Sequence, residues 1–376
     1  MPLIYLIAGE QSGDMLGGRL MQAIRARCPD VRFAGIGGEA MAAQGLVSLF
    51  AMHELSLLGL FEVAPKLLRI RSLFRQTIED IRTRRPEIVV TIDSPGFTLR
   101  VLRAIGPGGP RRVHYVAPQV WAWRENRVRH YPGLWDDLLC LLPFEVPFFG
   151  RHNLPARFVG HPVLESGADK GSGERFRRRH AIGPQAKIVT IMPGSRPSEV
   201  SRLLPVLEAT LARIDLPLVP VVPLAGPVEN IVRQATTRWP IQPILVSDPQ
   251  EKFDAFAASA AALTKSGTST LELAMANVPM LVTYRVNPLS AWVGHWVIKV
   301  KYASILNLVL DRAIVPELIQ RHGRPERLAA ELRRLLNDPA AVAEQRAGFA
   351  AALAMLRAPA GMPSDCAAEA VLSMLG

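Results

Sequence analysis

The chain alternates short apolar runs with longer helical patterns, and this alternation occurs twice. The short runs are rich in Val, Ile and Leu with little apolar–polar alternation, which is typical of parallel strands buried on both faces. We expect strands at Leu3–Ala8, Val31–Gly35, Ile88–Ile92, Arg112–Val116, Leu138–Leu142 and Phe158–Val159, and then at Ile188–Met192, Leu218–Val222, Ile244–Val246, Ala261–Leu263 and Met280–Thr283. Helical patterns fill the gaps, among them Met15–Arg27, Leu203–Ile214 and Thr270–Ala276. This repetition predicts an α/β protein with two Rossmann-like domains, whose ligands bind at the carboxyl ends of the strands.

A stretch without strand character separates the two halves. Residues 163–186 contain four glycines, a proline and a run of arginines between positions 175 and 179. With 376 residues, the chain is too long for one ordinary core. We expect a first Rossmann-like domain at residues 1–165, a linker at 166–186, a second Rossmann-like domain at 187–340 and a helical segment at 341–376.

The net charge of +11 and the pI near 10.1 call for an explanation. A nucleic acid, an anionic lipid or a phosphorylated substrate would each suit it, and so would a solvated basic surface. Cys28, Cys140 and Cys366 have no metal or redox spacing, which fits a reducing cytoplasm. We expect no secretory signal, and no apolar run reaches the roughly 18–20 residues that span a bilayer.

Three loops of the first half carry polar or aromatic residues directly after expected strands. Glu10, Ser12, Gly13 and Asp14 open a helix, where free amides favour an anion, although a plain turn with Asp14 as the helix cap explains them too. The spacing matches neither a Walker A nor a dinucleotide fingerprint. Asp93 is placed to act as a general base, or merely as a turn residue.

The third loop is aromatic. It contains Gln119, Trp121, Trp123 and Arg124. Trp and Arg are common where a surface makes specific contacts, and a packed hydrophobic loop is the alternative.

Two loops of the second half have the character of phosphate sites. Ser195 and Arg196 precede a helix, where Ser195 can cap the helix and Arg196 can meet a phosphate together with the helix amides. The second loop contains Lys265, Ser266, Gly267 and Thr268, and Glu272 in the following helix can accept hydrogen bonds from ribose hydroxyls. These loops predict a nucleotide diphosphate in the second half and leave the first half for the acceptor.

Taken together, these loops resemble the lipid-A-disaccharide synthase family. The matching segments occur in the family's order and cover nearly the whole chain: residues 8–14, 114–124, 142–145, 158–162 and 193–196, and Ser266-Gly267-Thr268 with Glu272. The resemblance implies a GT-B fold, UDP-2,3-diacylglucosamine as donor and 2,3-diacylglucosamine 1-phosphate as acceptor. The products would be the β-1,6-linked disaccharide phosphate and UDP.

The implied reaction inverts the anomeric carbon, so a single displacement needs one base and no covalent nucleophile. The resemblance makes Asp93 that base. Arg196, Lys265 and the amides of Ser266–Thr268 would meet the charge on the leaving UDP. Asn307, in a segment similar to one of the family's, is a lesser candidate for the uracil or phosphate end. We expect no metal and no cofactor.

The chain departs from the family at one site. The usual pattern near the base is Asp-x-Pro-Asp-Phe-Asn, whereas this chain has Gly96 and Thr98 at the second Asp and the Asn. The departure favours Asp93 as the working carboxylate and leaves open what replaces the two missing side chains.

A segment of the first half has the composition of a membrane-docking surface. The residues Leu67, Ile70, Phe74, Ile78 and Ile81 form one helical stripe that is expected to pack on the sheet. Leu68 and Leu73 lie off the stripe beside Lys66, Arg69, Arg71 and Arg75, and Leu57, Leu58, Leu60 and Phe61 precede them. Leucines among cations predict docking on anionic lipid, at the cytoplasmic face of the inner membrane; an ordinary surface helix is the alternative.

Two other functions are alternatives to sugar transfer. A nucleotide-sugar epimerase would share the two-sheet architecture but would need no lipid-facing surface. A basic nucleic-acid-binding protein would need aromatic residues and cations along a groove, whereas here the aromatics lie in strand-end loops and the arginines are spread. The sequence leaves open a homodimer, the acyl-chain length and the extent of domain closure.

Overall fold

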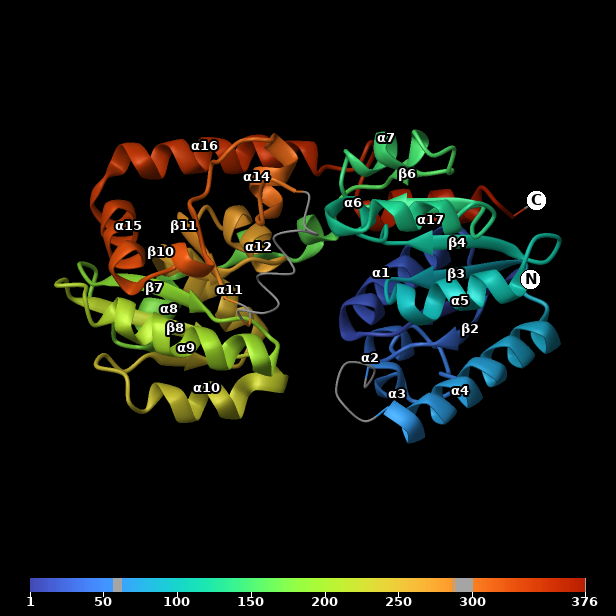
Figure 1. The fold of residues 1–376 in the computed structure, drawn as a ribbon, viewed down its shortest axis with the longest axis horizontal. Helices are drawn as coiled ribbons and strands as arrows, with labels where there is room; N and C mark the ends of the chain where they lie inside the picture. Colours follow the sequence, from blue (N-terminus) through green and yellow to red (C-terminus); the bar gives the residue numbers. More distant parts are fainter. Residues whose placement is uncertain (57–62, 286, 288–299, 376) are drawn as a thin grey trace. The chain divides into compact units, whose positions relative to one another are not determined.

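The computed structural model of the chain describes residues 1–56, 63–285, 287 and 300–375. The chain forms two compact units, one made of Met1–Pro162 with Leu356–Gly376 and the other of Val163–Met355. Each unit has its own six-stranded parallel sheet (Figure 1). The expected α/β class with two Rossmann-like sheets is therefore confirmed.

The first sheet has the strand order β2-β1-β3-β4-β5-β6. Its strands are β1 (Leu3–Ala8), β2 (Arg32–Ile36), β3 (Ile88–Ile92), β4 (Arg111–Tyr115), β5 (Asp137–Cys140) and β6 (Arg157–Phe158). Every residue of β1 and β3 is buried. This burial explains why both segments are continuous apolar runs without alternation.

Helices cover both faces of this sheet. The helices α1 (Gln11–Arg27) and α17 (Pro363–Leu372) pack on one face, and α4 (Val63–Arg84) and α5 (Pro95–Ile105) pack on the other. Short helices occupy the connections: α2 (Glu39–Ala42), α3 (His53–Ser56), α6 (Val120–Trp123), a 3-10 turn at Glu125–His130 and α7 (Glu145–Gly150).

The second sheet has the order β12-β11-β10-β7-β8-β9. Its strands are β7 (Lys187–Met192), β8 (Leu218–Pro223), β9 (Ile244–Val246), β10 (Ser259–Lys265), β11 (Met280–Tyr284) and β12 (Glu317–Ile319). The strand β12 was not expected from the sequence. This strand is a short, half-buried edge strand directly after Pro316, and it therefore has no apolar run to reveal it.

The helices of the second unit are α8 (Gly173–Arg179), α9 (Pro197–Leu211), α10 (Glu229–Thr236), α11 (Pro249–Ala258), α12 (Ser269–Met275), α14 (Ile305–Leu310), α15 (Pro325–Asn337) and α16 (Pro339–Met355). Proline stands in the first turn of α9, α11 and α15. A proline there fixes a helical φ and removes an N–H that has no partner in the helix, so it marks where each helix begins.

The segment expected to be a linker belongs to the second unit. The N–H of Ser172 donates to Asp254 of α11, and Arg175 of α8 forms an ion pair with the same carboxylate. Phe176 is buried in the second unit's core. The expectation of a linker was wrong, because Phe176 anchors α8 in the core of the second unit.

The C-terminal segment is divided between the two units. The helix α16 belongs to the second unit, and the chain from Leu356 onward belongs to the first. There α17 packs against α1, with Ala367, Ala368 and Val371 fully buried. The expectation of one helical segment at 341–376 is thus corrected to two helices in different units.

The helix α4 corrects part of the expected membrane surface. Leu73 is fully buried in the first unit's core, together with Ile78 and Ile81, whereas Leu68 is 68% exposed. Position 73 therefore belongs to the packing face. The side chain of Lys66 and the residues Leu57, Leu58, Leu60 and Phe61 lie outside the described part of the structure.

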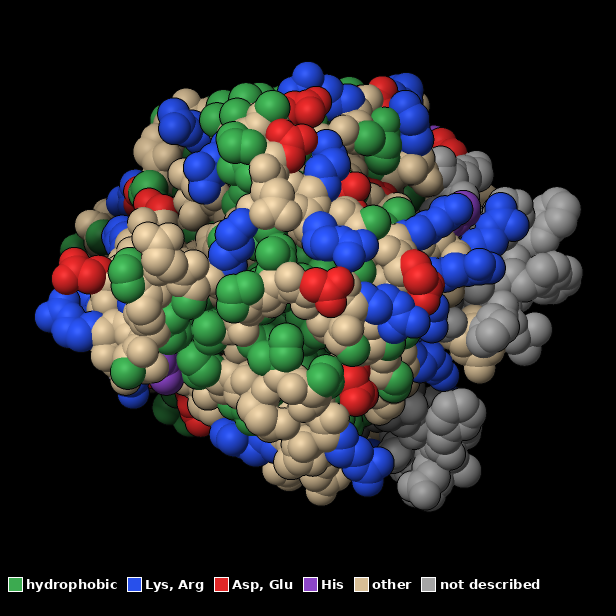
Figure 2. All heavy atoms as spheres, turned by 90° about the vertical axis from the view of Figure 1, so that its left-hand side faces the viewer, with side chains coloured by type: hydrophobic (Ala, Val, Ile, Leu, Met, Phe, Trp, Pro, Cys, Tyr) green, Lys and Arg blue, Asp and Glu red, His purple; other side chains and the backbone are tan. Residues whose placement is uncertain are grey.

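Surface charge is mixed on the face drawn in Figure 2. Lys and Arg side chains there are interspersed with acidic, polar and apolar ones. No helix within the described residues has the length and apolar character needed to cross a membrane.

Candidate functional site

The carboxyl ends of β1, β3 and β4 lie side by side, because these strands are neighbours in the first sheet. Gly9 follows β1, and a Cβ atom placed on it would lie only 2.6 Å from Oγ of Ser94, which follows β3. A glycine is needed for the two loops to approach this closely. The structure thus brings the Glu10–Asp14 loop and the Asp93 loop together at one edge of the sheet.

Asp14 is a helix cap, as the alternative interpretation held, but it caps α2 rather than the helix in which it lies. Its carboxylate accepts hydrogen bonds from the N–H groups of Gly38, Ala40 and Met41, at 2.7, 2.8 and 3.1 Å. Asp14 is 4% exposed, so it caps the start of α2 and is not open to an acceptor. Gly13 is buried as well, whereas Glu10 and Ser12 are exposed at the same edge.

Asp93 lies in a strained turn between β3 and α5. Asp93 and Ser94 have φ values of 51° and 46°, a left-handed backbone that is costly for residues other than glycine. Thr98 of α5 holds this turn, since its hydroxyl donates to the carbonyl oxygens of Asp93 at 2.7 Å and Ser94 at 3.0 Å. Gly96 is exposed, and a Cβ atom there would meet nothing within 4 Å. Thr98 therefore braces the turn that carries Asp93.

The electrostatic setting of Asp93 suits proton transfer. Burial raises the pKa of this carboxyl, and the hydrogen bond from the N–H of Ser94 to Oδ1 opposes the rise only in part. A carboxylate with a raised pKa is a stronger base than an exposed one.

The aromatic loop after β4 begins with a second strained residue. Val116 has a φ of 80°, which is rare for a β-branched side chain, and its N–H donates to Leu139 of β5. Beyond it, Gln119 is exposed. Trp123 is 41% exposed, and the guanidinium of Arg124 lies 4.1 Å from its ring centre. These three side chains remain available to a ligand.

Glu145 holds the aromatic loop in place. Its Oε1 accepts a hydrogen bond from Nε1 of Trp121 at 3.1 Å, and its Oε2 accepts from the N–H groups of Leu141 and Leu142. The ring of Trp121 also lies edge-on to Phe144, at 4.9 Å. The sequence analysis included Glu145 only as part of a matching segment. An acidic residue at the start of a helix directly after a buried strand is the signal that could have singled it out.

Burial raises the pKa of Glu145 to about 7, although the three hydrogen bonds favour the charged form. The buried His114 behaves in the opposite way, since burial lowers its pKa to about 3 and keeps the ring neutral. Nδ1 of His114 lies 2.8 Å from the hydroxyl oxygen of Thr91. Burial thus favours the uncharged form of both Glu145 and His114.

In the second unit, a buried glutamate organises the predicted phosphate loops. Glu199 is 6% exposed. Its carboxylate lies 3.1 Å from Nζ of Lys265 and 3.6 Å from the guanidinium of Arg196, and it accepts a hydrogen bond from the hydroxyl of Tyr284. These partners follow or end β7, β10 and β11, which are neighbouring strands. Glu199 therefore gathers the predicted cations at one edge of the sheet.

The helix after the Arg196 loop begins differently from the prediction. Arg196 itself is the N-cap of α9, and Ser195 makes no capping hydrogen bond. Both side chains are exposed, with Arg196 75% exposed. Their exposure leaves them open to a ligand.

The loop after β10 is partly committed to internal contacts. The hydroxyl of Ser266 donates to the carbonyl of Ala303 at 2.6 Å, whereas a Cβ atom on Gly267 would meet nothing within 4 Å. Thr268 is exposed at the start of α12. Both carboxylate oxygens of Glu272 lie 3.1 Å from Nζ of Lys252, a cation that the sequence analysis did not consider.

Asn307 is fully buried, which corrects its expected role at the uracil or phosphate end. Its amide donates to Val315 and Glu317 and accepts from the N–H groups of Ile314 and Val315. It therefore fastens the loop after α14 and does not face a ligand. Within the described residues, no group of three or more His, Cys, Asp or Glu side chains is placed to hold a metal ion.

Solved structures with the same two-sheet arrangement include enzymes of nucleotide-sugar chemistry. The UDP-GlcNAc 2-epimerase from Neisseria meningitidis bound to UDP-GlcNAc has a TM-score of 0.64 and 11% identity, covering 100% of this chain and 99% of that one. CalG4, the calicheamicin glycosyltransferase, has a TM-score of 0.60 and 16% identity, covering 100% and 98%. At these identities the likeness concerns the fold alone, which is the GT-B fold.

The sequence comparisons are more specific. The family described as lipid-A-disaccharide synthetase matches residues 4–371. The chain is 52% identical to the lipid-A-disaccharide synthase of Granulibacter bethesdensis, covering 100% of this chain and 99% of the relative. It is 52% identical to that of Gluconobacter oxydans, covering 99% and 91%. The chain belongs to the lipid-A-disaccharide synthase family of glycosyltransferases, as the resemblance implied, and the epimerase alternative shares only its fold.

The raised pKa of Glu145 makes a testable contribution to stability. The carboxyl has an ordinary pKa of 4.5 and one of about 7 in the folded chain, so between these values only the folded chain holds the proton. The stabilisation is complete below pH 4.5 and is lost as the pH rises through 7. Glu145→Gln removes this titration. From pH 4.5 to 7.5, we expect the free energy of unfolding of the wild type to fall by about 3 kcal/mol relative to that of Glu145→Gln.

Urea unfolding at a series of pH values measures this difference. The exposed Glu39→Gln is the matched control, and its pH dependence should parallel that of the wild type. Parallel curves for Glu145→Gln and the wild type would contradict the assignment.

Proposed function

We propose that the chain transfers 2,3-diacylglucosamine from UDP to the 6-hydroxyl of 2,3-diacylglucosamine 1-phosphate, with Asp93 as the general base. The observation that carries this proposal is the strained turn of Asp93, which combines a left-handed backbone with a raised carboxyl pKa at the carboxyl end of β3. Strain of this kind persists where the surrounding structure fixes it, and it clusters at functional sites. Family membership supplies the reaction, and the geometry supports the role of the residue.

In the proposed reaction the Asp93 carboxylate takes the proton of the acceptor's 6-hydroxyl. The oxygen attacks the anomeric carbon of the donor while the bond to UDP breaks, so the configuration inverts in one displacement. Thr98 keeps the carboxylate's backbone in position. The exposed Glu10, Ser12, Gln119 and Trp123, with the half-buried Arg124, form the acceptor side at the same sheet edge.

The second unit binds UDP in this proposal. Arg196 and Lys265 meet the diphosphate, together with the backbone amides of Ser266, Gly267 and Thr268. Lys252 presents Glu272 for the ribose hydroxyls. Glu199 sets the positions of both phosphate-binding cations before the donor arrives, so their charge is preorganised for the leaving group.

The replacement Asp93→Asn tests the base. It retains the shape of the side chain and removes its proton affinity, so we expect kcat to fall by roughly 10²–10⁴-fold with little change in UDP binding. The assay mixes UDP-diacylglucosamine with the acceptor and measures disaccharide and UDP by mass. Asp30→Asn makes the same change at an exposed site and should retain wild-type activity. A wild-type rate for Asp93→Asn would exclude Asp93 as the base.

The replacement Arg196→Ala tests the diphosphate site. We expect UDP affinity to fall by about 1.5–3 kcal/mol, the usual contribution of a hydrogen bond to a charged group. Calorimetric titration with UDP measures the change. Arg202→Ala, an exposed arginine on the same helix, is the control and should leave the affinity intact. Equal affinities for both variants would remove Arg196 from the site.

The enzyme is further proposed to dock on the cytoplasmic face of the inner membrane through α4. Leu68, Arg71, Arg75 and Arg82 are exposed, and their spacing places them along one side of the helix. Arg71, Arg75 and Arg82 have no ion pair within the described residues, whereas Arg69 is paired with Glu54. An exposed leucine with unpaired cations is what an interfacial helix requires.

The triple replacement of Leu68→Ser, Arg71→Gln and Arg75→Gln tests this surface. Each cation near anionic lipid contributes about 1 kcal/mol, so we expect sedimentation with phosphatidylglycerol vesicles to weaken by about tenfold or more. The pair Arg100→Gln and Arg238→Gln removes two exposed arginines elsewhere and serves as the control for net charge. If the triple variant sediments as the wild type does, and high salt has no effect, α4 is not the docking surface.

A further inference from the structure

A groove of about 730 Å³ lies at the amino-terminal edge of the first sheet. Its walls are the last turns of α4, the loop at Ile105–Pro110 and the first residues of β4. Asp93 follows the opposite end of β3, and five residues at about 3.3 Å each put roughly 16 Å between the two edges. The groove is therefore separate from the proposed catalytic edge.

The groove has apolar lining from three segments. Ile78 and Ile81 of α4 reach it, although they are only 8% and 4% exposed. Ile105 at the end of α5 and Met374, which follows α17, also line it, and both are half-buried. The apolar surface that Ile105 and Met374 leave open to water suits a hydrocarbon group.

Cations surround this apolar lining. Arg82, Arg85 and Arg111 are exposed and line the groove, and none of them has an ion pair within the described part of the chain. The acidic residues of the lining are already engaged. Oε2 of Glu87 accepts the N–H of Leu3 at 2.6 Å, and Asp136 is held by Arg112.

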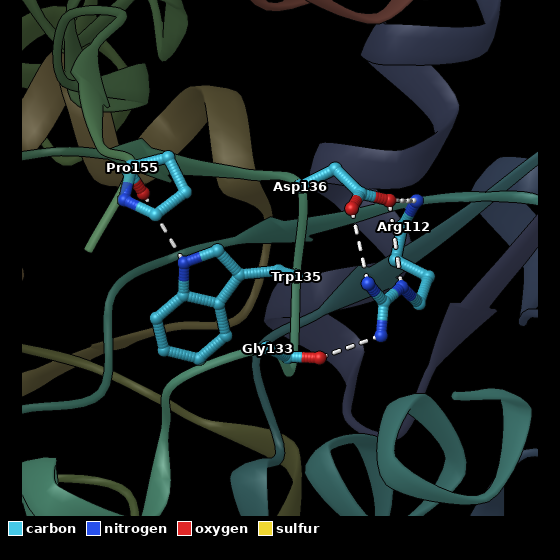
Figure 3. Close-up of polar contacts among 5 residues, drawn as sticks. All are labelled: Arg112, Gly133, Trp135, Asp136 and Pro155. Carbon is cyan, nitrogen blue, oxygen red and sulfur yellow. Dashed lines mark hydrogen bonds and ion pairs between the residues drawn. The ribbon is translucent and has the colours of Figure 1, made fainter. Parts of the chain in front are cut away.

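Figure 3 shows how the second of these acids is neutralised. The guanidinium of Arg112 donates to both oxygens of Asp136 and to the carbonyl of Gly133, and Arg112 is 3% exposed. Burial alone would raise the pKa of Asp136, but the hydrogen bonds from Arg112 and the charges of Arg112 and Arg111 together lower the pKa. The preceding residue, Trp135, is held by a hydrogen bond from its Nε1 to the carbonyl of Pro155 at 3.1 Å. Asp136 is thus engaged mainly by Arg112, which leaves the guanidinium of Arg111 without an ion pair in the described part of the chain.

The loop between α5 and β4 leaves the groove open on one side. Pro107 and Gly108 form a turn there, and Gly108 has a φ of 86°, which an L-residue rarely adopts. A Cβ atom on Gly108 would meet nothing within 4 Å. Exposed arginines around an open loop form a setting for a phosphate oxyanion.

We propose that this groove binds one anionic phospholipid, with the phosphate among Arg82, Arg85 and Arg111 and an acyl chain along Ile78, Ile81 and Ile105. A free phosphate would leave the apolar lining unused. A nucleic acid would be expected to stack its bases on aromatic rings, and none of the described lining residues is aromatic. The proposal builds on the membrane docking proposed for α4, because the same helix carries the exposed Leu68 near its start and lines the groove at its end. The bound lipid would hold the enzyme at the surface where its acylated substrates are found.

The test uses a lipid that stays monomeric in water, so that it does not depend on vesicle docking. Dihexanoylphosphatidylglycerol below its micelle concentration is titrated into the full-length protein, and binding is followed by calorimetry. Dihexanoylphosphatidylcholine has the same chains without net charge, and glycerol phosphate has the anion without chains. We expect phosphatidylglycerol to bind at least about tenfold more tightly than either of them.

The double replacement of Arg85→Gln and Arg111→Gln should weaken phosphatidylglycerol binding by about tenfold or more, because each cation contributes about 1 kcal/mol. The pair Arg100→Gln and Arg238→Gln is the matched control and should bind as the wild type does. Both pairs should retain kcat with detergent-dispersed substrates, which also shows that they fold.

The outcomes separate the two lipid proposals. If the Leu68, Arg71 and Arg75 variant loses vesicle binding but retains monomer binding, docking and the groove are distinct sites. Equal binding of phosphatidylglycerol by the Arg85 and Arg111 variant and by the wild type would overturn the groove site. Equal binding of phosphatidylcholine, or of glycerol phosphate, would overturn it as well, because either result removes one half of the proposed recognition.

Discussion

Burial of the parallel strands on both faces is the constraint on which the rest of the molecule depends. A polar side chain in the middle of such a strand must find its partner inside the protein, as Thr91 and His114 do with each other. Groups that are to meet a ligand can therefore lie only at the strand ends. In each unit the polar residues proposed to bind substrate follow strands that are neighbours in the sheet, so the strand order brings these residues together within that unit.

Buried carboxylates connect the loops at these edges. Asp14 joins the loop after β1 to the start of α2, Glu145 joins the ends of β4 and β5, and Glu199 joins three strand ends of the second sheet. Burying a carboxylate is costly unless hydrogen bonds or cations compensate it. At Asp14 three N–H groups do so, and at Glu199 two cations and a hydroxyl do so. Glu145 has three neutral donors, and burial still holds its pKa well above the ordinary value.

The sequence was sufficient for every strand of the two sheets except β12 and for the order of the loops, because these follow from local patterns. The span of β1 was predicted residue for residue, and Asp93 falls directly at the end of β3. What required the tertiary structure was the partner of each polar side chain. Asp14 and Asn307 are polar residues in or near the expected ligand loops. Both instead accept hydrogen bonds from backbone N–H groups whose positions no local sequence pattern predicts. Leu73 was expected on the lipid-facing side because it lies off the stripe at 3-and-4 spacing. It is buried because the packing face of α4 is wider than that stripe.

Backbone strain is also distributed unequally between the two edges of the first sheet. The left-handed Asp93, Ser94 and Val116 all lie at the carboxyl edge, and each costs on the order of 1–3 kcal/mol. At the opposite edge, only Arg85 among the non-glycine lining residues of the groove is left-handed, and there it ends a helix. A glycine at position 93 or 94 would relieve the strain, but a glycine at 93 would also remove the carboxylate. The turn that produces this strain places a half-buried carboxylate directly after β3, and Thr98 holds that turn from the first residues of α5.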